Sequence, residues 1–230
     1  MNSPKVIVFA GKDRVGKSTF AKGLKERLDK VIGGNNVYVD SFGHYLRKAV
    51  SEVFGIPYEW MTTFEGKEKV IRLGDYEYDR FIVTEWYKRS DIDSIVEFEN
   101  IRISIRSLMI FFGTDIMRAK NPYVWPEGVE AHIKDLMTEK EDGIWFLIND
   151  DPREPEDFKY LESRGAMFFF LKNEENPFCD YKNRSEERAL EYIKAHIDNF
   201  IIVRTYIRDH EDGINSVFEV IKNKFSLIDE

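Results

Sequence analysis

The chain has little that would link it covalently or hold it in a membrane. It contains one cysteine, Cys179, among 230 residues, so no internal disulfide can form, and such cysteine usage is typical of a reducing compartment. No apolar run approaches the ~18 residues of a membrane-spanning helix, and no basic segment followed by an apolar one opens the chain. These absences predict a soluble, cytoplasmic protein.

Basic residues are outnumbered by acidic ones. The chain has 34 Lys and Arg against 42 Asp and Glu, which gives a net charge of −8. A nucleic-acid polymer or an anionic membrane surface is therefore not expected as a partner, whereas a small anion is still accommodated where basic residues converge. The four histidines are too scattered to predict a metal site: His44, His132, His196 and His210.

Hydrophobic residues make up 43% of the chain, which is ordinary for a globular protein with a full core. The length suits a single domain, residues 1–230, that carries a substantial insertion. We place this insertion at about residues 74–100, in the part of the chain where helix and strand patterns are least readable. The oligomeric state is left open, with a homodimer as one option.

The most informative stretch is an apolar strand pattern that runs into a glycine loop. Residues 6–10 read V-I-V-F-A, residues 11–18 read G-K-D-R-V-G-K-S, and a helical pattern begins at Phe20. This order of strand, G-x-x-x-x-G-K-S loop and helix is the Walker A phosphate loop. The glycines let successive backbone N–H groups converge on phosphate oxygens, and the start of the helix adds more N–H groups.

The side chains of this loop have separate expected roles. Lys17 bridges the β- and γ-phosphates of ATP, and the Ser18 hydroxyl ligates Mg²⁺. Arg14 either touches phosphate or is solvated. The alternative for the whole stretch is a glycine-rich turn capped by Ser18, but the strand, spacing, lysine, hydroxyl and helix together favour nucleotide binding. The predicted nucleotide-binding residues are Gly11, Asp13, Arg14, Val15, Gly16, Lys17, Ser18 and Thr19.

Further strand patterns alternate with helical ones along the chain. Apolar runs predict strands at 37–39, 144–148, 166–171 and 199–203, in addition to the first strand. We therefore expect an α/β fold of the P-loop kinase type, with a parallel sheet of about five strands and helices on both faces. Functional loops lie at the carboxyl ends of such strands, so the phosphate loop, Asp40 and residues 149–153 should meet in one crevice.

Two strand-end carboxylates are candidates for work in that crevice. Asp40 or Asp150 could hold Mg²⁺ through water or orient an acceptor, and Asp150 ranks ahead of Asp151 because it ends the apolar run. Arg153 reaches the transferring phosphate or pairs with Glu156.

The phosphate loop alone does not name the reaction. No N-K-x-D follows a strand and no convincing D-x-x-G is present, which disfavours a regulatory GTPase. The apolar run at 146–148 ends in Asn149-Asp150 without the Glu typical of motor ATPases. A small kinase that moves the γ-phosphate to a second bound molecule fits best.

Separated segments beyond the loop resemble phage-type deoxynucleoside monophosphate kinases, relatives of the adenylate kinase group. The similar segments are S-F-G-H-Y-L-R-K at 41–48 with F-G-I-P at 54–57, K-E at 67–68, R-S-L-M-I-F-F-G-T-D at 106–115 with Arg118 and P-x-x-W at 122–125, D-D-P-R-E-P-E at 150–156, and R-S-E at 184–186. The chain departs from the family where Lys and Gln are expected, at Ser107 and Ile110. This departure leaves the base preference open.

The resemblance implies an ATP- and Mg²⁺-dependent transfer of phosphate to a deoxynucleoside monophosphate, with small-molecule nucleotides as partners. It implies catalytic roles for Lys17, Arg106, Asp150 and Arg153, and a water-excluding lid at about residues 172–188 that carries Lys182, Arg184 and Arg188. Arg106 would clamp the acceptor phosphate, the alternative being a surface ion pair. Trp125 would stack on the acceptor base or else pack in the core. The implied acceptor-binding residues are Asp40, Phe42, Arg106, Gly113, Arg118, Trp125 and Asp150.

Two other functions stay open at this point. One is a small-molecule kinase of the same fold that acts on a nucleoside or a cofactor precursor. The other is a P-loop ATPase or regulator whose hydrolysis drives a conformational change.

Overall fold

The computed structural model describes residues 3–12, 15–32, 36–76, 100–139, 144–172, 184–205 and 210–227, without the side chains of 184–186. Several predictions of site residues and segments therefore lie outside the described residues. These are Asp13, Arg14, Lys182, the side chain of Arg184, most of the insertion at 74–100 and most of the lid at 172–188.

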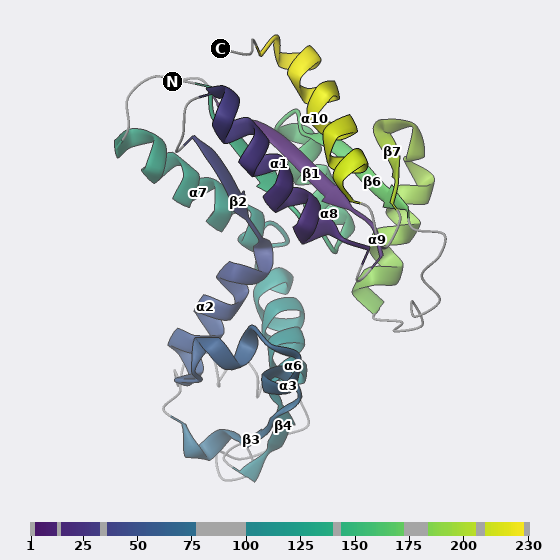
Figure 1. Ribbon diagram of the computed structural model, residues 1–230. Coiled ribbons are helices and arrows are strands. Elements are labelled where there is room, and N and C mark those ends of the chain that lie inside the picture. The colour runs from purple at the N-terminus through teal and green to yellow at the C-terminus, as the bar shows by residue number, and fades with distance from the viewer. Residues whose placement is uncertain are drawn as a thin grey trace. The chain divides into compact units, whose positions relative to one another are not determined.

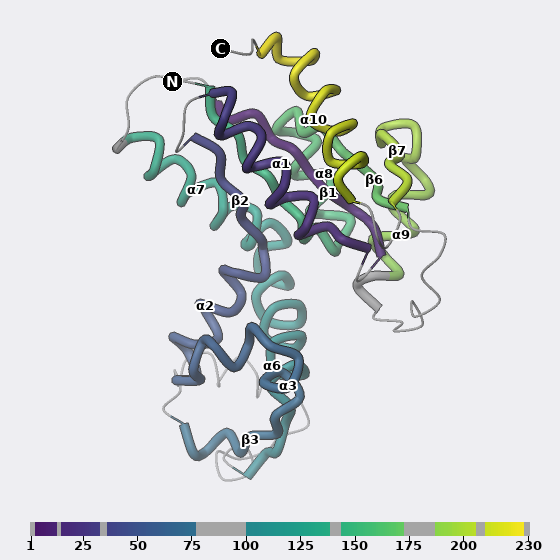
Figure 2. The backbone as a smooth tube through the Cα atoms, in the orientation of Figure 1, coloured from purple at the N-terminus to yellow at the C-terminus, as the bar shows by residue number. Residues whose placement is uncertain are grey.

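The described chain forms two compact units. The first comprises Met1–Phe42 and Val129–Glu230, and the second comprises Gly43–Gly128. The tube in Figure 2 shows that the first unit is built from both ends of the chain, purple and yellow, with the second unit inserted between them. The second unit is larger than the insertion that the sequence suggests.

A five-stranded parallel sheet forms the centre of the first unit, in the order β2-β5-β1-β6-β7. Its strands are β1 (Lys5–Ala10), β2 (Val37–Asp40), β5 (Phe146–Asn149), β6 (Met167–Lys172) and β7 (Phe200–Arg204). The central strand β1 pairs with β5 on one side and with β6 on the other. The predicted α/β fold and all five strand positions are confirmed.

Helices cover both faces of this sheet (Figure 1). On one face lie α1 (Lys17–Ile32) and α10 (Glu211–Phe225), and the other face carries α8 (Pro155–Ser163) and α9 (Arg184–Ala195). Successive side chains of a strand point to opposite faces of the sheet, so each strand packs against helices on both faces. Phe9 and Phe169 pack toward Phe20 of α1, whereas Phe168 and Phe200 pack against Phe158 of α8.

Helix α1 follows directly from its sequence. Its buried residues are Phe20, Ala21, Leu24 and Leu28, which recur on one face of a 3.6-residue period. All four are fully buried, so the helix that starts at the phosphate loop is held firmly against the sheet.

The second unit is built mostly from short elements. It contains α2 (Phe42–Phe54, whose first residue belongs to the first unit), α3 (Phe64–Glu68), α6 (Ile105–Ile110), a π-helix (Phe111–Arg118) and the start of α7 (Val124–Glu139), with 3₁₀ turns at Tyr58–Met61 and Leu73–Asp75. An antiparallel pair, β3 (Val70–Arg72) and β4 (Arg102–Ser104), is present as well. A third 3₁₀ turn, Ile197–Asn199, belongs to the first unit.

None of the helices in the described part of the chain combines the length and the apolar character that crossing a bilayer requires.

Candidate functional site

The phosphate loop joins the central strand β1 to α1, and its two glycines adopt conformations that other residues rarely take. The φ angles are +149° at Gly11 and +97° at Gly16. A Cβ on Gly11 would lie 2.6 Å from the carbonyl oxygen of Leu171, and one on Gly16 would lie 3.1 Å from the His210 ring. Conformation therefore favours glycine at both positions, and at Gly11 the lack of space excludes a side chain as well.

The Lys17 side chain folds back over this loop. Its Nζ donates hydrogen bonds to the carbonyl oxygens of Gly11, at 2.9 Å, and Lys12, at 2.7 Å. Lys17 is also the first residue of α1, whose opening N–H groups have no acceptor within the helix. The ammonium group of Lys17 and the opening N–H groups of α1 thus lie at the same loop, an arrangement that binds phosphate oxygens.

Asp150 follows β5, the strand beside β1, and its carboxylate accepts a hydrogen bond from the Ser18 hydroxyl. Burial raises the pKa of Asp150 above its ordinary value, and the nearby charge of Asp151 acts in the same direction. The Ser18 hydroxyl and the Lys17 ammonium oppose this rise in pKa. The sequence brought Lys17, Ser18 and Asp150 forward as separate candidates, and the structure places them together.

Hydroxyl and carboxylate oxygens are the ligands that Mg²⁺ prefers, so Ser18 and Asp150 fit a magnesium ion. The raised pKa of Asp150 points the same way, because a buried carboxylate with too little compensating charge is stabilised by a cation. Within the described ranges no three His, Cys, Asp or Glu residues cluster in a way that would hold a metal. The donor set therefore suits an ion that is bound mainly through phosphate and water.

A buried amide connects the ends of β2 and β5. Asn149 is fully buried; its Nδ2 donates to the carbonyl oxygen of Asp40 at 3.2 Å, and its Oδ1 accepts from the backbone N–H of Asp151 at 3.2 Å. Asp40 in turn accepts from the N–H of Ser41 at 2.8 Å. Asn149 was not singled out from the sequence. Its position could have marked it as a candidate, because it is an amide at the end of a wholly apolar strand.

Two predicted arginines of the first unit are engaged in ion pairs. Arg153 pairs with Asp151 at 2.6 Å rather than with Glu156, the partner considered from the sequence. Arg188 pairs with Glu154 at 3.0 Å. The Arg153 side chain is 60% exposed and that of Arg188 is 45% exposed, so both remain within reach of solvent.

Among the predicted acceptor residues of the second unit, both arginines have partners. Arg106 pairs with Glu68, which is the surface ion pair named as the alternative to a phosphate clamp. Its guanidinium also lies 5.7 Å from the centre of the Phe64 ring. Arg118 donates to the carbonyl oxygen of Pro122 at 3.1 Å.

Three other predicted acceptor residues, Phe42, Gly113 and Trp125, are buried. Trp125 is 5% exposed, its indole N–H donates to the carbonyl oxygen of Gly113 at 3.3 Å, and its ring packs near Phe112. A Cβ on Gly113 would lie 2.9 Å from the Leu46 side chain. Phe42 is 4% exposed. These positions favour packing, the alternative that the sequence left open for Trp125.

Two residues near the phosphate loop were missed from the sequence. The His210 ring lies against Gly16, and Thr205 follows β7 with only 3% of its surface exposed. Both residues follow the last predicted strand, and this position could have singled them out, because functional loops of parallel sheets follow the strands.

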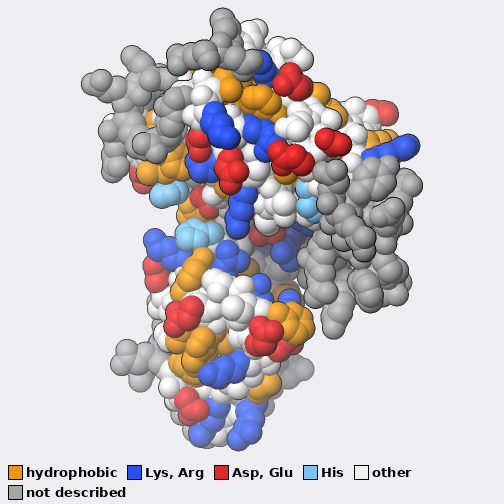
Figure 3. All heavy atoms as spheres, viewed as in Figure 1, with side chains coloured by type: hydrophobic (Ala, Val, Ile, Leu, Met, Phe, Trp, Pro, Cys, Tyr) orange, Lys and Arg blue, Asp and Glu red, His pale blue; other side chains and the backbone are white. Residues whose placement is uncertain are grey.

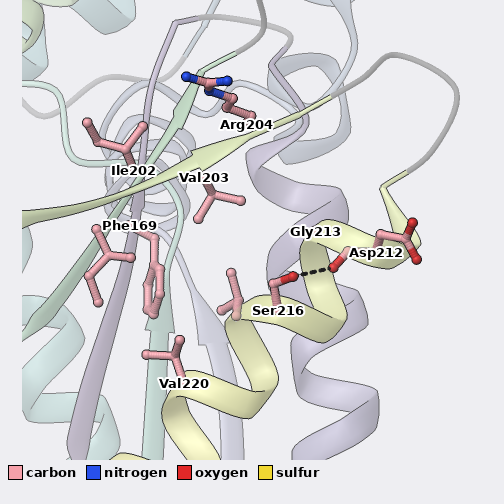
Figure 4. Close-up of a pocket in the computed structure, with 10 residues that line it drawn as sticks. Phe169, Ile202, Val203, Arg204, Asp212, Gly213, Ser216 and Val220 are labelled. Atoms are coloured by element: carbon pink, nitrogen blue, oxygen red, sulfur yellow. Dashed lines mark hydrogen bonds between the residues drawn. The ribbon is translucent and has the colours of Figure 1, made fainter.

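A groove of about 350 Å³ lies elsewhere on the first unit, between β7 and the first turns of α10 (Figure 4). Phe169, Val203 and Val220 line it, Arg204 lies at its rim, and the Ser216 hydroxyl donates to the carbonyl oxygen of Asp212 at 2.8 Å. None of its lining residues belongs to the phosphate loop. The groove is thus separate from the site built by Lys17, Ser18 and Asp150.

The chain matches no protein-family model and no curated protein sequence. Among solved structures it is similar to a shikimate kinase from Bacteroides thetaiotaomicron, with 12% identity and a TM-score of 0.38, over 97% of this chain and 99% of that one. It is also similar to two plasmid partition protein structures from Borrelia burgdorferi. One, bound to AMPPNP, has 16% identity and a TM-score of 0.34 over 97% of this chain and all of that one. The other has 16% identity and a TM-score of 0.35, over 96% of this chain and 87% of that one. These three TM-scores lie below 0.5, so the similarities carry no conclusion about the function of this chain.

Proposed function

We propose that this chain is an ATP- and Mg²⁺-dependent kinase that transfers the γ-phosphate of ATP to a (deoxy)nucleoside monophosphate. The observation that carries the proposal is the hydrogen bond from Ser18 to Asp150 beside Lys17, at the carboxyl ends of two neighbouring parallel strands. These three side chains supply a hydroxyl, a carboxylate and an ammonium group around a loop whose backbone is shaped for phosphate.

In the proposed reaction an oxygen of the acceptor phosphate bonds to the γ-phosphorus, and the bond from that phosphorus to the β–γ bridging oxygen breaks. The products are a nucleoside diphosphate and ADP. Lys17 exchanges its loop carbonyl partners for β- and γ-phosphate oxygens and offsets the negative charge on them. Ser18 and Asp150 would hold Mg²⁺, which would supply further neutralisation of the phosphate charge.

The acceptor assignment rests on the resemblance of separated segments to phage-type deoxynucleoside monophosphate kinases. Arg106 in one of these segments is able to serve, because its side chain is 41% exposed and its partner Glu68 is 46% exposed. Surface ion pairs of this kind contribute only about 0–1 kcal/mol. A phosphate that accepts two parallel hydrogen bonds from the guanidinium would displace Glu68.

A panel assay tests the proposal. The purified chain with ATP and Mg²⁺ is offered each deoxynucleoside monophosphate, each ribonucleoside monophosphate and each nucleoside, while ADP and the phosphorylated product are quantified. We expect ADP and nucleoside diphosphate in equal amounts with at least one monophosphate. Release of ADP without an acceptor would instead support an ATPase, and turnover with unphosphorylated acceptors alone would support a different small-molecule kinase.

Arg106→Ala should raise the KM for the monophosphate roughly 10- to 100-fold, the effect of losing charge-assisted hydrogen bonds, and leave the KM for ATP unchanged. Arg102→Ala is the matched control, because Arg102 is an exposed arginine on the neighbouring strand β4. Equal effects of the two substitutions would contradict the acceptor role of Arg106.

A further inference from the structure

The parallel sheet of the first unit has two edge strands, and they differ in exposure. At one edge no residue of β2 is exposed. At the other edge β7 pairs with β6 alone among the described strands, and its exposed residues are Ile201, Ile202 and Arg204. Proteins normally cover, charge or interrupt an edge strand, because its unpaired backbone groups bind readily to another strand. β7 is therefore the edge at which a further strand can be added.

The backbone groups of β7 alternate between β6 and the outer edge. The N–H of Thr205, directly after the strand, donates to the carbonyl oxygen of Lys172 of β6 at 2.9 Å. Backbone groups of every second residue in a strand point the same way, so those of Val203 also face β6. The N–H and C=O groups of Ile202 and Phe200 consequently face outward, where a second strand finds both donors and acceptors.

Apolar side chains flank this edge on both faces of the sheet. Ile202 is 53% exposed, and Ile201, which points to the opposite face, is 38% exposed. Ile201 and Val220 of α10, the latter also 38% exposed, line the groove of about 350 Å³ beside the strand (Figure 4). Apolar surface next to an outward-facing strand backbone is typical of a contact with another polypeptide.

The charges beside β7 favour a second copy of this chain as that polypeptide. Arg204 and Asp198 are both exposed, and they lie three residues to either side of Ile201. A twofold axis through Ile201 would bring Arg204 of each copy opposite Asp198 of the other, so opposite charges would meet at both ends of the paired strands. The same register pairs Ile202 with Phe200 of the second copy, and both residues direct their backbone groups outward. A register centred on Ile202 would instead place Arg204 opposite Phe200.

We infer that β7 is the interface of a homodimer, in which the β7 strands of two copies pair antiparallel about a twofold axis at Ile201. The two five-stranded sheets then join into one continuous sheet. The exposed surfaces of Ile201 and Val220 from both copies are buried together on one face of it. No residue of the phosphate loop takes part, so the dimer is independent of the proposed function.

Reversal of the two charges tests this pairing. The mass of the protein in solution is measured by analytical ultracentrifugation, over concentrations from low micromolar to millimolar, for the wild type, Arg204→Asp, Asp198→Arg and the double variant with both changes. Lys22→Glu is the matched control, because it reverses an exposed charge on α1, a helix that does not line the groove. Melting curves verify that each variant is folded.

We expect a wild-type dimer with twice the mass of the chain. Each single variant should raise its dissociation constant roughly tenfold or more, because like charges would then lie opposite each other at both ends of the interface. The double variant should regain the wild-type affinity, since it exchanges the two charges, and Lys22→Glu should keep it. Backbone hydrogen exchange at the N–H of Ile202 should be slower in the dimer than in the dissociated single variants.

A wild type that stays monomeric at every concentration would overturn the inference and leave a strand of another protein as the occupant of this edge. A dimer that neither single variant weakens would overturn it as well, because the two copies would then meet at another surface. A folded double variant that does not regain dimer affinity would contradict the register at Ile201. These outcomes do not depend on whether the chain binds ATP or transfers phosphate.

Discussion

At the scale of single residues, the site depends on a carboxyl group, that of Asp150, in a place where its charged form is unfavourable. Asp150 has a raised pKa because it is buried and close to Asp151, and the hydrogen bond from Ser18 and the charge of Lys17 compensate only in part. A buried carboxylate of this kind lowers the stability of the ligand-free protein, and it gains a favourable partner once a cation is bound. Groups with shifted pKa values are common at catalytic sites for this reason.

Asp150→Asn should therefore stabilise the ligand-free protein at neutral pH and abolish Mg²⁺-dependent ATP binding. A carboxyl whose pKa is higher in the folded than in the unfolded state lowers stability increasingly as pH rises above its unfolded pKa, about 3.9, and fully above its folded pKa. The gain should appear as a higher melting temperature at pH 7. It should shrink as pH falls toward 4.

Melting curves from pH 8 to pH 4.5 measure this dependence. Asp135→Asn is the matched control, because it replaces an exposed carboxylate on α7 and should leave the melting temperature unchanged. A wild type that is more stable than Asp150→Asn at pH 7 would contradict the raised pKa.

At the scale of elements, the apolar runs were enough to predict the five parallel strands, because strands covered on both faces are apolar throughout. The pair β3–β4 was not predicted, since each strand has only three residues and no readable alternation. The π-helix at Phe111–Arg118 follows α6 without a change in the sequence pattern, because Leu108, Phe112 and Ile116 keep a spacing of four residues and are all buried. Sequence spacing does not distinguish the two helix types.

The candidate site was predictable to the extent that it is a linear motif. Lys17 and Ser18 follow from the loop pattern, and Asp150 follows from the end of an apolar strand. Thr205 and His210 come near the loop only through the pairing of β6 with β7, so their proximity is a property of the tertiary fold. Arg106 was predicted from a family resemblance, and its ion pair with Glu68 became visible only in the structure.

The loop itself provides a test at this scale. Gly11→Ala should destabilise the protein by about 1–3 kcal/mol and weaken ATP binding, because φ is +149° and the added Cβ would lie 2.6 Å from the Leu171 oxygen. Gly165→Ala is a matched control with a φ of +69° and no atom within 4 Å of the added Cβ. It should cost less stability and leave ATP binding unchanged.

Denaturant unfolding and ATP titration measure the two effects separately. If Gly11→Ala bound ATP as the wild type does, the backbone of the loop would not be set by this close approach.

At the scale of the whole molecule, charge is distributed rather than concentrated. Acidic and basic side chains intermingle over the face shown in Figure 3, in keeping with a net charge of −8. Attraction of an anion therefore depends on a local gathering of donors, such as the ammonium group and helix N–H groups at the phosphate loop, rather than on the overall field. This is expected of a protein that binds a small nucleotide.

The most direct test of the central claim is the melting temperature with and without ATP and Mg²⁺. At an ATP concentration of about 100 Kd, binding stabilises the folded state by about 2.7 kcal/mol, which corresponds to a rise of roughly 5–10 °C for a chain of this length. Lys17→Ala should lose most of this rise, and Lys22→Ala, which removes an exposed lysine from the same helix, should keep it. A wild-type melting temperature that ATP and Mg²⁺ leave unchanged would contradict the phosphate-binding loop on which the account depends.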